Sequence, residues 1–451
     1  MKKTNSFLMK YYDYVIIAFI YGLLHVFMHT DYWDDIATSQ ILTKYNFNLL
    51  QALSDTWNIW SSRIFIHVAE AIFGYLPNYV WKTVDVIIIL TAYHFFNKIV
   101  TIFSPNTSAK KIWPLLFFLS FPYSLFATAG WITTTINYSW PFAMLFYGIY
   151  LFVASSRNVP IKWHSYILYF FALLFSCNFD TISISLFLCL LCIYVTRKTK
   201  NKSFNILFLE GILTSVINIA MFVLSPGNQV RLIKDAEYHN SADLLDLSFT
   251  GHLRMGINST FYHFMSVPNI ILFTFCFLLI VCVFHKTSSH NLRVISFIPM
   301  SLDVIWTAYL FFRYTVPNRT LTFIYPDSSF QTSPKTEQYL AVISALAIVL
   351  IIIYFLGYLT DFTDLSAFLI GNVLILGLLP EMVLGFTTTV SVSIIRMASF
   401  FYFSLMFCTQ VLMNKYHILK ENIWKHVFYT LGIIGTILNL LQMIRHIIVY
   451  G

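Results

Sequence analysis

Long apolar runs recur along the whole chain, and they constrain its fold more than any other feature. Runs of about 17 to 22 mostly apolar residues are long enough to cross the hydrocarbon core of a bilayer as helices. Only 11% of the residues are charged, whereas soluble domains usually carry about 25%. The sequence therefore predicts an all-α polytopic membrane protein with about thirteen transmembrane helices. These spans are expected near residues 13–29, 82–99, 112–128, 139–154, 164–179, 181–196, 204–224, 267–285, 294–312, 339–358, 365–384, 397–413 and 427–444.

Basic residues gather in every second loop between the expected spans, and the positive-inside rule assigns these loops to the cytoplasm. The N-terminus is then cytoplasmic, and its apolar run is an uncleaved first helix because no small-residue cleavage site follows. The loop at 357–364 has no basic residue, and Arg445 and His446 at the expected outer C-terminus fit the rule poorly. The long outer loops are expected near residues 30–80, 225–266, 313–338 and 385–396.

The formal net charge of +8 does not indicate a nucleic-acid partner. The basic residues are spread over short loops, and no patch interleaves them with aromatic residues. All six cysteines lie inside or at the ends of apolar runs, where packing is the better interpretation than metal binding. The partner that composition predicts is the lipid bilayer.

Three aspartates are crowded into the stretch HTDYWDDIATSQ, directly after the first apolar run. Like charges this close at a lipid boundary favour a raised pKa for at least one of Asp31, Asp34 and Asp35, or a nearby cation. A divalent cation, Mg²⁺ or Mn²⁺, bound by Asp34 and Asp35 stays open, because no histidine lies at ligand spacing. The alternative is an acidic loop that caps the next helix. Asp34 and Asp35 are our candidate catalytic residues.

The later part of the first outer loop, RIFIHVAEAIFGYLP, has the periodicity of a short amphipathic helix. Arg63, His67, Glu70 and Gly74 share one side, and apolar residues cover the other. Such a helix is too short to span, so we expect it in the outer interface. The polar stripe either is solvated or faces a site with Asp34 and Asp35 at its floor.

Further polar candidates lie in short motifs that the predicted topology places outside. Asn137 and Trp140 belong to GWITTTINYSWP, where aromatic anchoring in the interface is the default interpretation. Asp180 lies in NFD, a tight turn between two spans, where capping and function are both open. The motif SPGNQVR turns at its proline and glycine and presents Asn228 and Arg231. Arg396 precedes a late span.

These residue types suit one kind of chemistry. Arginine donates through a planar fork that matches phosphate oxygens, so Arg63, Arg231 and Arg396 suit a lipid phosphate. A carboxylate near neutral pKa suits removal of a proton from an attacking hydroxyl. Together they predict glycosyl transfer from a polyprenyl-phosphate sugar, with inversion expected because one carboxylate suffices as base.

The order of these motifs resembles a family of bacterial polytopic glycosyltransferases of the GT-C type, akin to the phage-type O-antigen glucosyltransferases. The Asp-Asp pair, WSSR, GWITTTINYSWP, NFD, SPGNQVR and the late Arg396 follow one another over most of the chain. The resemblance implies a single GT-C-like domain over residues 1–451 in the bacterial plasma membrane, with its catalytic aspartate in the first outer loop. It also implies a polyprenyl-phosphate-linked donor and a cell-surface glycan acceptor. The family's tight turn often carries Glu, where this chain has Asp180.

Two other functions remain open. A flippase or transporter of lipid-linked glycans would favour charged residues at mid-membrane and internal repeats. Asp85, Glu210 and Asp303 fall within or near span ends, but no inverted repeat is evident. A glycan polymerase or ligase is the other alternative, supported by the loop at 225–266 with Arg231 and Arg254.

Overall fold

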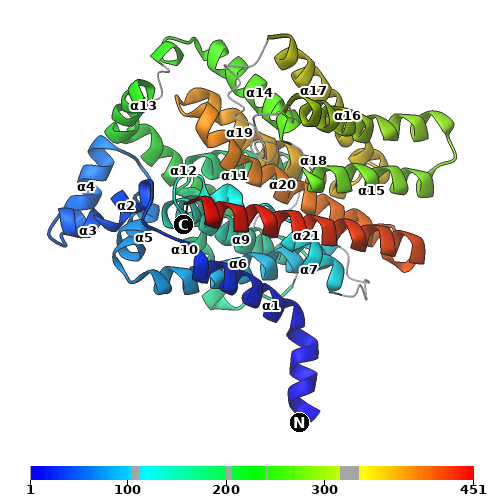
Figure 1. The fold of residues 1–451 in the computed structure, drawn as a ribbon, viewed down its shortest axis with the longest axis horizontal. Coiled ribbons are helices and arrows are strands. Elements are labelled where there is room, and N and C mark those ends of the chain that lie inside the picture. Colours follow the sequence, from blue (N-terminus) through cyan, green and yellow to red (C-terminus); the bar gives the residue numbers. More distant parts are fainter. Residues whose placement is uncertain are drawn as a thin grey trace. The chain divides into compact units, whose positions relative to one another are not determined.

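The computed structural model describes residues 2–103, 111–157, 159–199, 206–238, 242–267, 269–314 and 335–450 (Figure 1). This part of the chain is built from helices and contains no strand, so the predicted all-α class is confirmed. The helices form two compact units, residues 1–231 with 436–451, and residues 232–435. A single GT-C-like domain over 1–451 stays a prediction.

Eight stretches within the described residues are long and apolar enough to cross a membrane, which makes the chain a multi-pass membrane protein. A ninth candidate is a pair of helices bent by 84°. The expected count of thirteen stays a prediction, because the helices near 112–127, 163–177 and 180–195 are shorter. The eight stretches are Asn78–Phe103, Trp131–Ser156, Ile206–Leu224, His290–Phe312, Lys335–Leu359, Asp364–Phe386, Ser393–Lys415 and Asn422–Val449, and the bent pair is Phe249–Ser266 with Ile270–Lys286.

The first unit packs its long helices around the stretch Trp131–Ser156, which is mostly buried. In Figure 1, α1 runs beside α6, and α9 packs against both α6 and α10. Its elements are α1 (Lys2–Phe27), α2 (Asp34–Ser39), α3 (Ile41–Lys44), α4 (Leu49–Ile59), α5 (Ile64–Tyr75), α6 (Asn78–Phe103), α7 (Ile112–Leu119), η1 (Tyr123–Ala127), α8 (Trp131–Thr134), the π-helical η2 (Thr135–Ser139), α9 (Trp140–Ser156), α10 (Trp163–Cys177), α11 (Asp180–Thr199), α12 (Ile206–Leu224) and the first turns of α13 (Pro226–Tyr238).

The segment at 30–80 consists mainly of four helices, α2 to α5. The predicted amphipathic helix is present as α5, and its small residues are used for close packing. A Cβ added at Gly74 would lie 2.7 Å from the Thr38 carbonyl oxygen, so α5 contacts the backbone of α2 directly. The Gly74 side of α5 is therefore packed against protein rather than solvated. A location in the outer membrane interface stays a prediction.

The stretch GWITTTINYSWP is helical rather than a loop before a later span. It forms α8 and η2, so the helix that was expected from residue 139 already begins at Trp131. Its threonines are polar, which hid the helix from a hydropathy reading, but they are largely buried, and Thr133 and Thr135 bond side chains of other helices. Thr135 Oγ1, for example, accepts a hydrogen bond of 3.0 Å from the Trp81 indole.

The second unit is organised around α20, whose apolar stretch Ser393–Lys415 is almost wholly buried. The span Asp364–Phe386 is irregular, because it passes through a π-helical turn and ends in a 3-10 turn. The elements are the remainder of α13, η3 (Ala242–Leu244), α14 (Phe249–Ser266), α15 (Ile270–Lys286), α16 (His290–Tyr314), α17 (Lys335–Leu359), α18 (Asp364–Gly371), the π-helical η6 (Asn372–Leu378), α19 (Leu379–Val383), η7 (Leu384–Phe386), α20 (Val390–Lys415), η8 (Ile418–Lys420) and the start of α21 (Asn422–Tyr450).

The loop at 357–364 had no basic residue of its own to set its side of the membrane. In the structure its Asp361 pairs with Lys286 at the end of α15, and its other oxygen is 3.3 Å from Lys415 Nζ at the end of α20. The loop therefore lies at the same end of the second unit as two basic helix ends. The side of the membrane on which this end lies stays a prediction.

Candidate functional site

The acidic stretch places one of its three aspartates inside the protein. Asp35 is fully buried in α2, whereas Asp31 and Asp34 are exposed. The two carboxylate oxygens of Asp35 accept the backbone N–H groups of Ile132, at 3.1 Å, and Thr133, at 2.8 Å. These groups open the α8 helix, so Asp35 satisfies donors that a helix start leaves without a partner.

Burial raises the pKa of Asp35 to about 7, and the hydrogen bonds from Thr133 and Ile132 offset this only in part. The prediction that at least one of the aspartates has a raised pKa is therefore confirmed. Desolvation of a buried carboxylate, rather than repulsion among the three, produces the shift.

Gly130 allows the backbone at the start of α8 to approach the Asp35 carboxylate closely. Its φ is +104°, and a Cβ there would lie 2.5 Å from Asp35 Oδ1. A residue with a side chain would meet both backbone strain and a clash with the carboxylate. The glycine of GWITTT is thus explained by the aspartate about a hundred residues before it in the chain.

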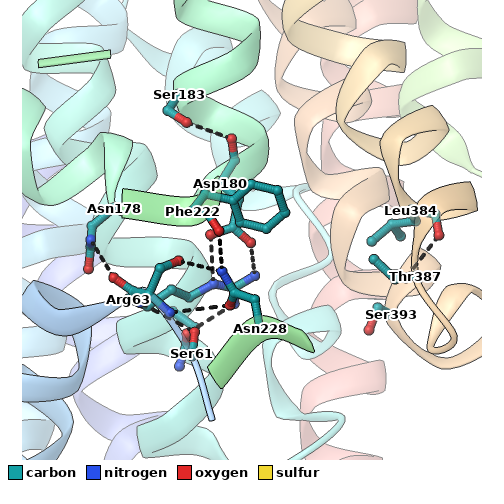
Figure 2. A network of polar contacts seen from close by, with 12 residues as sticks. Ser61, Arg63, Asn178, Asp180, Ser183, Phe222, Asn228, Leu384, Thr387 and Ser393 are labelled. Carbon is teal, nitrogen blue, oxygen red and sulfur yellow. Dashed lines mark hydrogen bonds and ion pairs between the residues drawn. The ribbon is translucent and has the colours of Figure 1, made fainter. Parts of the chain in front are cut away.

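Arg63 and Asp180 form the ion pair at the centre of the site (Figure 2). Arg63 Nε and Nη2 donate to the two oxygens of Asp180 at 3.3 Å and 2.9 Å, and both side chains are largely buried. The guanidinium carbon lies 4.4 Å from the centre of the Phe179 ring. Burial alone would lower the pKa of Arg63, but the Asp180 carboxylate raises it above its usual value, so the arginine stays charged.

Polar residues of α5 and η2 connect the Arg63–Asp180 pair with the helix turn that binds Asp35. Glu70 accepts from Asn137 Nδ2, and His67 Nδ1 is 3.0 Å from the other Glu70 oxygen. Asn137 also donates to the Thr133 carbonyl at 2.8 Å and accepts from Arg63 Nη1 at 3.4 Å. A continuous chain of contacts therefore links the helix turn that binds Asp35 with the Arg63–Asp180 pair.

Two asparagines, Asn178 and Asn228, bond the backbone on either side of Arg63, and Figure 2 shows both beside the Arg63–Asp180 pair. Asn178 Oδ1 accepts the N–H groups of Phe65, at 2.9 Å, and Ile66, at 3.1 Å, which begin α5. Asn228 Oδ1 accepts the Ser62 N–H at 3.2 Å. Asn178 was not among the predicted site residues, although its motif NFD was noted for Asp180. The signal that could have identified it is an asparagine beside a charged turn residue.

The motif SPGNQVR packs against WSSR. Gly227 lies so close to the end of α4 that a Cβ there would be 2.6 Å from the Trp60 backbone nitrogen. The Arg231 guanidinium lies 5.0 Å from the Trp60 ring centre. Three motifs far apart in sequence, WSSR, NFD and SPGNQVR, are therefore in contact within the first unit.

Trp140 lies in the interior of the first unit rather than in the Arg63 cluster. Its indole donates to Asp85 Oδ1 at 2.7 Å. Asp85 Oδ2 lies 2.8 Å from His25 Nε2 and bonds the Tyr123 hydroxyl. The buried carboxylate that the sequence left unassigned is thus satisfied by three groups, one each from α1, η1 and α9.

Arg396 lies on α20 in the second unit and is half-buried. Its predicted contact with a lipid phosphate stays a prediction. Within the described residues, no three His, Cys, Asp or Glu side chains are placed to hold a metal ion. A Mg²⁺ or Mn²⁺ ion at Asp34 and Asp35 stays an open prediction.

Comparisons with protein-family models, with curated proteins and with solved structures found no match. The site is therefore interpreted from its own geometry and chemistry.

Proposed function

We propose that the protein is a membrane glycosyltransferase, which moves a sugar from a polyprenyl-phosphate donor to a cell-surface glycan. The observation that carries the proposal is the continuous polar network of Asp35, Asn137, Glu70, Arg63 and Asp180 in the first unit. It combines carboxylates with a charged arginine, the two functions that this transfer needs. The proposed location is a bacterial plasma membrane, with the site at its outer face and the N-terminus in the cytoplasm.

The structure supports different roles for the two candidate catalytic aspartates. Asp35 is buried, and its carboxylate accepts hydrogen bonds from two backbone N–H groups of α8. These contacts suit a positioning residue that fixes α2 on α8. Asp34 is the neighbouring residue and is exposed, which suits the base that removes the proton from the acceptor hydroxyl. The acceptor oxygen then bonds the anomeric carbon as the bond to phosphate breaks, and polyprenyl phosphate leaves with the electron pair.

Arg63 suits contact with the leaving phosphate. A guanidinium has five N–H groups, and the contacts to Asp180 and Asn137 use three of them. The remaining groups lie on Nη1 and Nη2 and are the donors that we assign to a phosphate oxygen. Asp180 holds the guanidinium plane, so the pair presents a fixed donor rather than a mobile charge.

The test is the surface-glycan composition of cells that carry Asp34→Asn, Asp35→Asn or Arg63→Lys, with the membrane abundance of each variant measured. We expect Asp34→Asn to lose one glycan substituent at normal abundance while its lipid-linked sugar accumulates. The exposed Asp246→Asn is a matched control and should leave the glycan unchanged. Unchanged glycans in all three site variants would refute the transferase.

One observation favours the transporter instead. The buried His25–Asp85 pair lies between α1 and α6, in the interior where the transport hypothesis requires charged groups. Lipid-linked glycan that accumulates on the cytoplasmic leaflet in Asp85→Asn cells, with normal glycan in Asp34→Asn cells, would support that function.

A further inference from the structure

The second unit contains a buried histidine–carboxylate pair that the Arg63 cluster does not explain. His263 on α14 and Glu381 on α19 have side chains that are only 4% and 3% exposed. His263 Nδ1 lies 3.6 Å from Glu381 Oε2. Buried polar groups of this kind normally have all their hydrogen bonds satisfied, because an unsatisfied one costs about 1–3 kcal/mol.

The other ring nitrogen of His263 does not meet that condition. Nε2 is buried, and no atom of the described residues forms a hydrogen bond with it. Glu381 faces the opposite nitrogen, so changing the tautomer moves the proton between the two nitrogens without giving Nε2 a partner. The pair therefore needs one more polar group at Nε2.

The backbone around the pair is built for close approach. A Cβ added at Gly385 would lie 2.3 Å from the Gly256 backbone nitrogen, and one added at Gly256 would lie 2.0 Å from the Met382 carbonyl oxygen. His252 Nδ1 lies 2.8 Å from the Gly385 carbonyl oxygen and fixes the same turn. The span that carries Glu381 includes a π-helical turn just before it, a feature frequent at functional sites.

We propose that His263 Nε2 binds a hydroxyl group of a ligand, with Glu381 orienting the imidazole from the other side. A hydroxyl is the group that fits either tautomer, because it can donate to a bare Nε2 or accept from Nε2–H. A carboxylate holding one imidazole nitrogen while the other contacts a hydroxyl is also the arrangement used to orient reacting hydroxyls. Under the proposed transferase function, on which this identification rests, the hydroxyl is that of a sugar.

Two substitutions of the same histidine separate the roles of its nitrogens. In His263→Asn the amide lies at the position of Nδ1, so the Glu381 contact is kept and the group at Nε2 is lost. In His263→Gln the amide reaches the position of Nε2 instead. The matched control is His252→Asn on the same helix, since the described contact of His252 is made by Nδ1.

The probe is octyl β-glucoside, which carries sugar hydroxyls on an apolar tail, added to ¹⁵N-histidine-labelled protein in lipid bilayers. We expect solid-state NMR to show magnetisation transfer from the glucoside protons to His263 Nε2, assigned by its loss in His263→Asn and its retention in His252→Asn. We expect His263→Gln to retain at least half of the wild-type glucoside binding, because its amide reaches the position of Nε2.

Transfer to Nε2 from water alone, unchanged by glucoside, would overturn the proposal and identify a structural water. Transfer from neither source would also overturn it. Because no sugar is transferred in this measurement, its failure is distinguishable from failure of the proposed function, which the glycan composition of Asp34→Asn cells reports.

Discussion

Arg63 and Asp180 are 117 positions apart in the chain, yet the guanidinium contacts both carboxylate oxygens. This contact joins the start of α5 to the tight turn between α10 and α11. Both side chains are largely buried, so removal of either one leaves the charge of the other buried without its partner.

We expect Arg63→Ala and Asp180→Ala each to destabilise the protein by about 2 kcal/mol, and the double variant by clearly less than the sum. A double-mutant cycle from unfolding midpoints in detergent measures this coupling. Lys415→Ala, which removes a pairing partner of the exposed Asp361, is the control and should shift the midpoint less. Additive effects of the two site substitutions would contradict a direct pair.

Asp35 should make stability dependent on pH. Its pKa in the folded protein is raised to about 7 from 3.8, so its contribution is fully present below pH about 4 and is lost as pH rises toward 7. Between pH 5 and 7 the loss is about 2 to 3 kcal/mol. We expect Asp35→Asn to flatten the pH dependence of the unfolding midpoint over this range, whereas Asp34→Asn keeps it. An identical slope in both variants would show that another group is responsible.

Gly130→Ala tests the contact between α8 and Asp35. The positive φ and the 2.5 Å approach of a Cβ to the carboxylate predict a loss of about 2 kcal/mol or more. Gly22→Ala is the control, because no atom lies within 4 Å of its added Cβ and alanine favours helix. We therefore expect the thermal unfolding midpoint to fall in Gly130→Ala, and to rise or stay unchanged in Gly22→Ala.

Asn178 is expected to act by positioning Arg63. Asn178→Asp keeps an acceptor for the N–H groups of Phe65 and Ile66, whereas Asn178→Leu leaves both without this partner. We expect a cost of about 2 kcal/mol for the leucine and less for the aspartate. Hydrogen exchange of the Phe65 and Ile66 amides provides the measurement, and equal protection in the two variants would argue against this role.

The contacts of Asp361 predict that the loop at 357–364 shares a membrane side with the loop after Lys286. Ser289→Cys and Phe362→Cys, both at exposed positions, should react with a membrane-impermeant maleimide only when it reaches the cytoplasmic side. The unsubstituted chain, with its native cysteines, sets the background. Labelling of the two positions from opposite sides would overturn the topology.

The sequence by itself determined the class of protein, because repeated apolar runs of this length are typical of transmembrane helices and rare in soluble proteins. It also identified most of the polar residues that the first unit brings together, since Asp35, Arg63, Asn137, Asp180 and Asn228 are conspicuous among apolar neighbours. Hydropathy could not find the helix start at Trp131, because the three consecutive threonines that follow Ile132 are polar and resemble a loop.

Only the tertiary structure decided which charges are paired and which are exposed. Asp34 and Asp35 are adjacent and chemically identical, and the approach of α8 at Gly130 is what buries one of them and not the other. Likewise, nothing local to Asn178 or His263 indicates that Asn178 bonds the Phe65 N–H or that His263 lies beside Glu381, contacts that join residues more than a hundred positions apart. Pairing across such separations depends on how helices pack, and packing is set by many weak contacts that no short motif encodes.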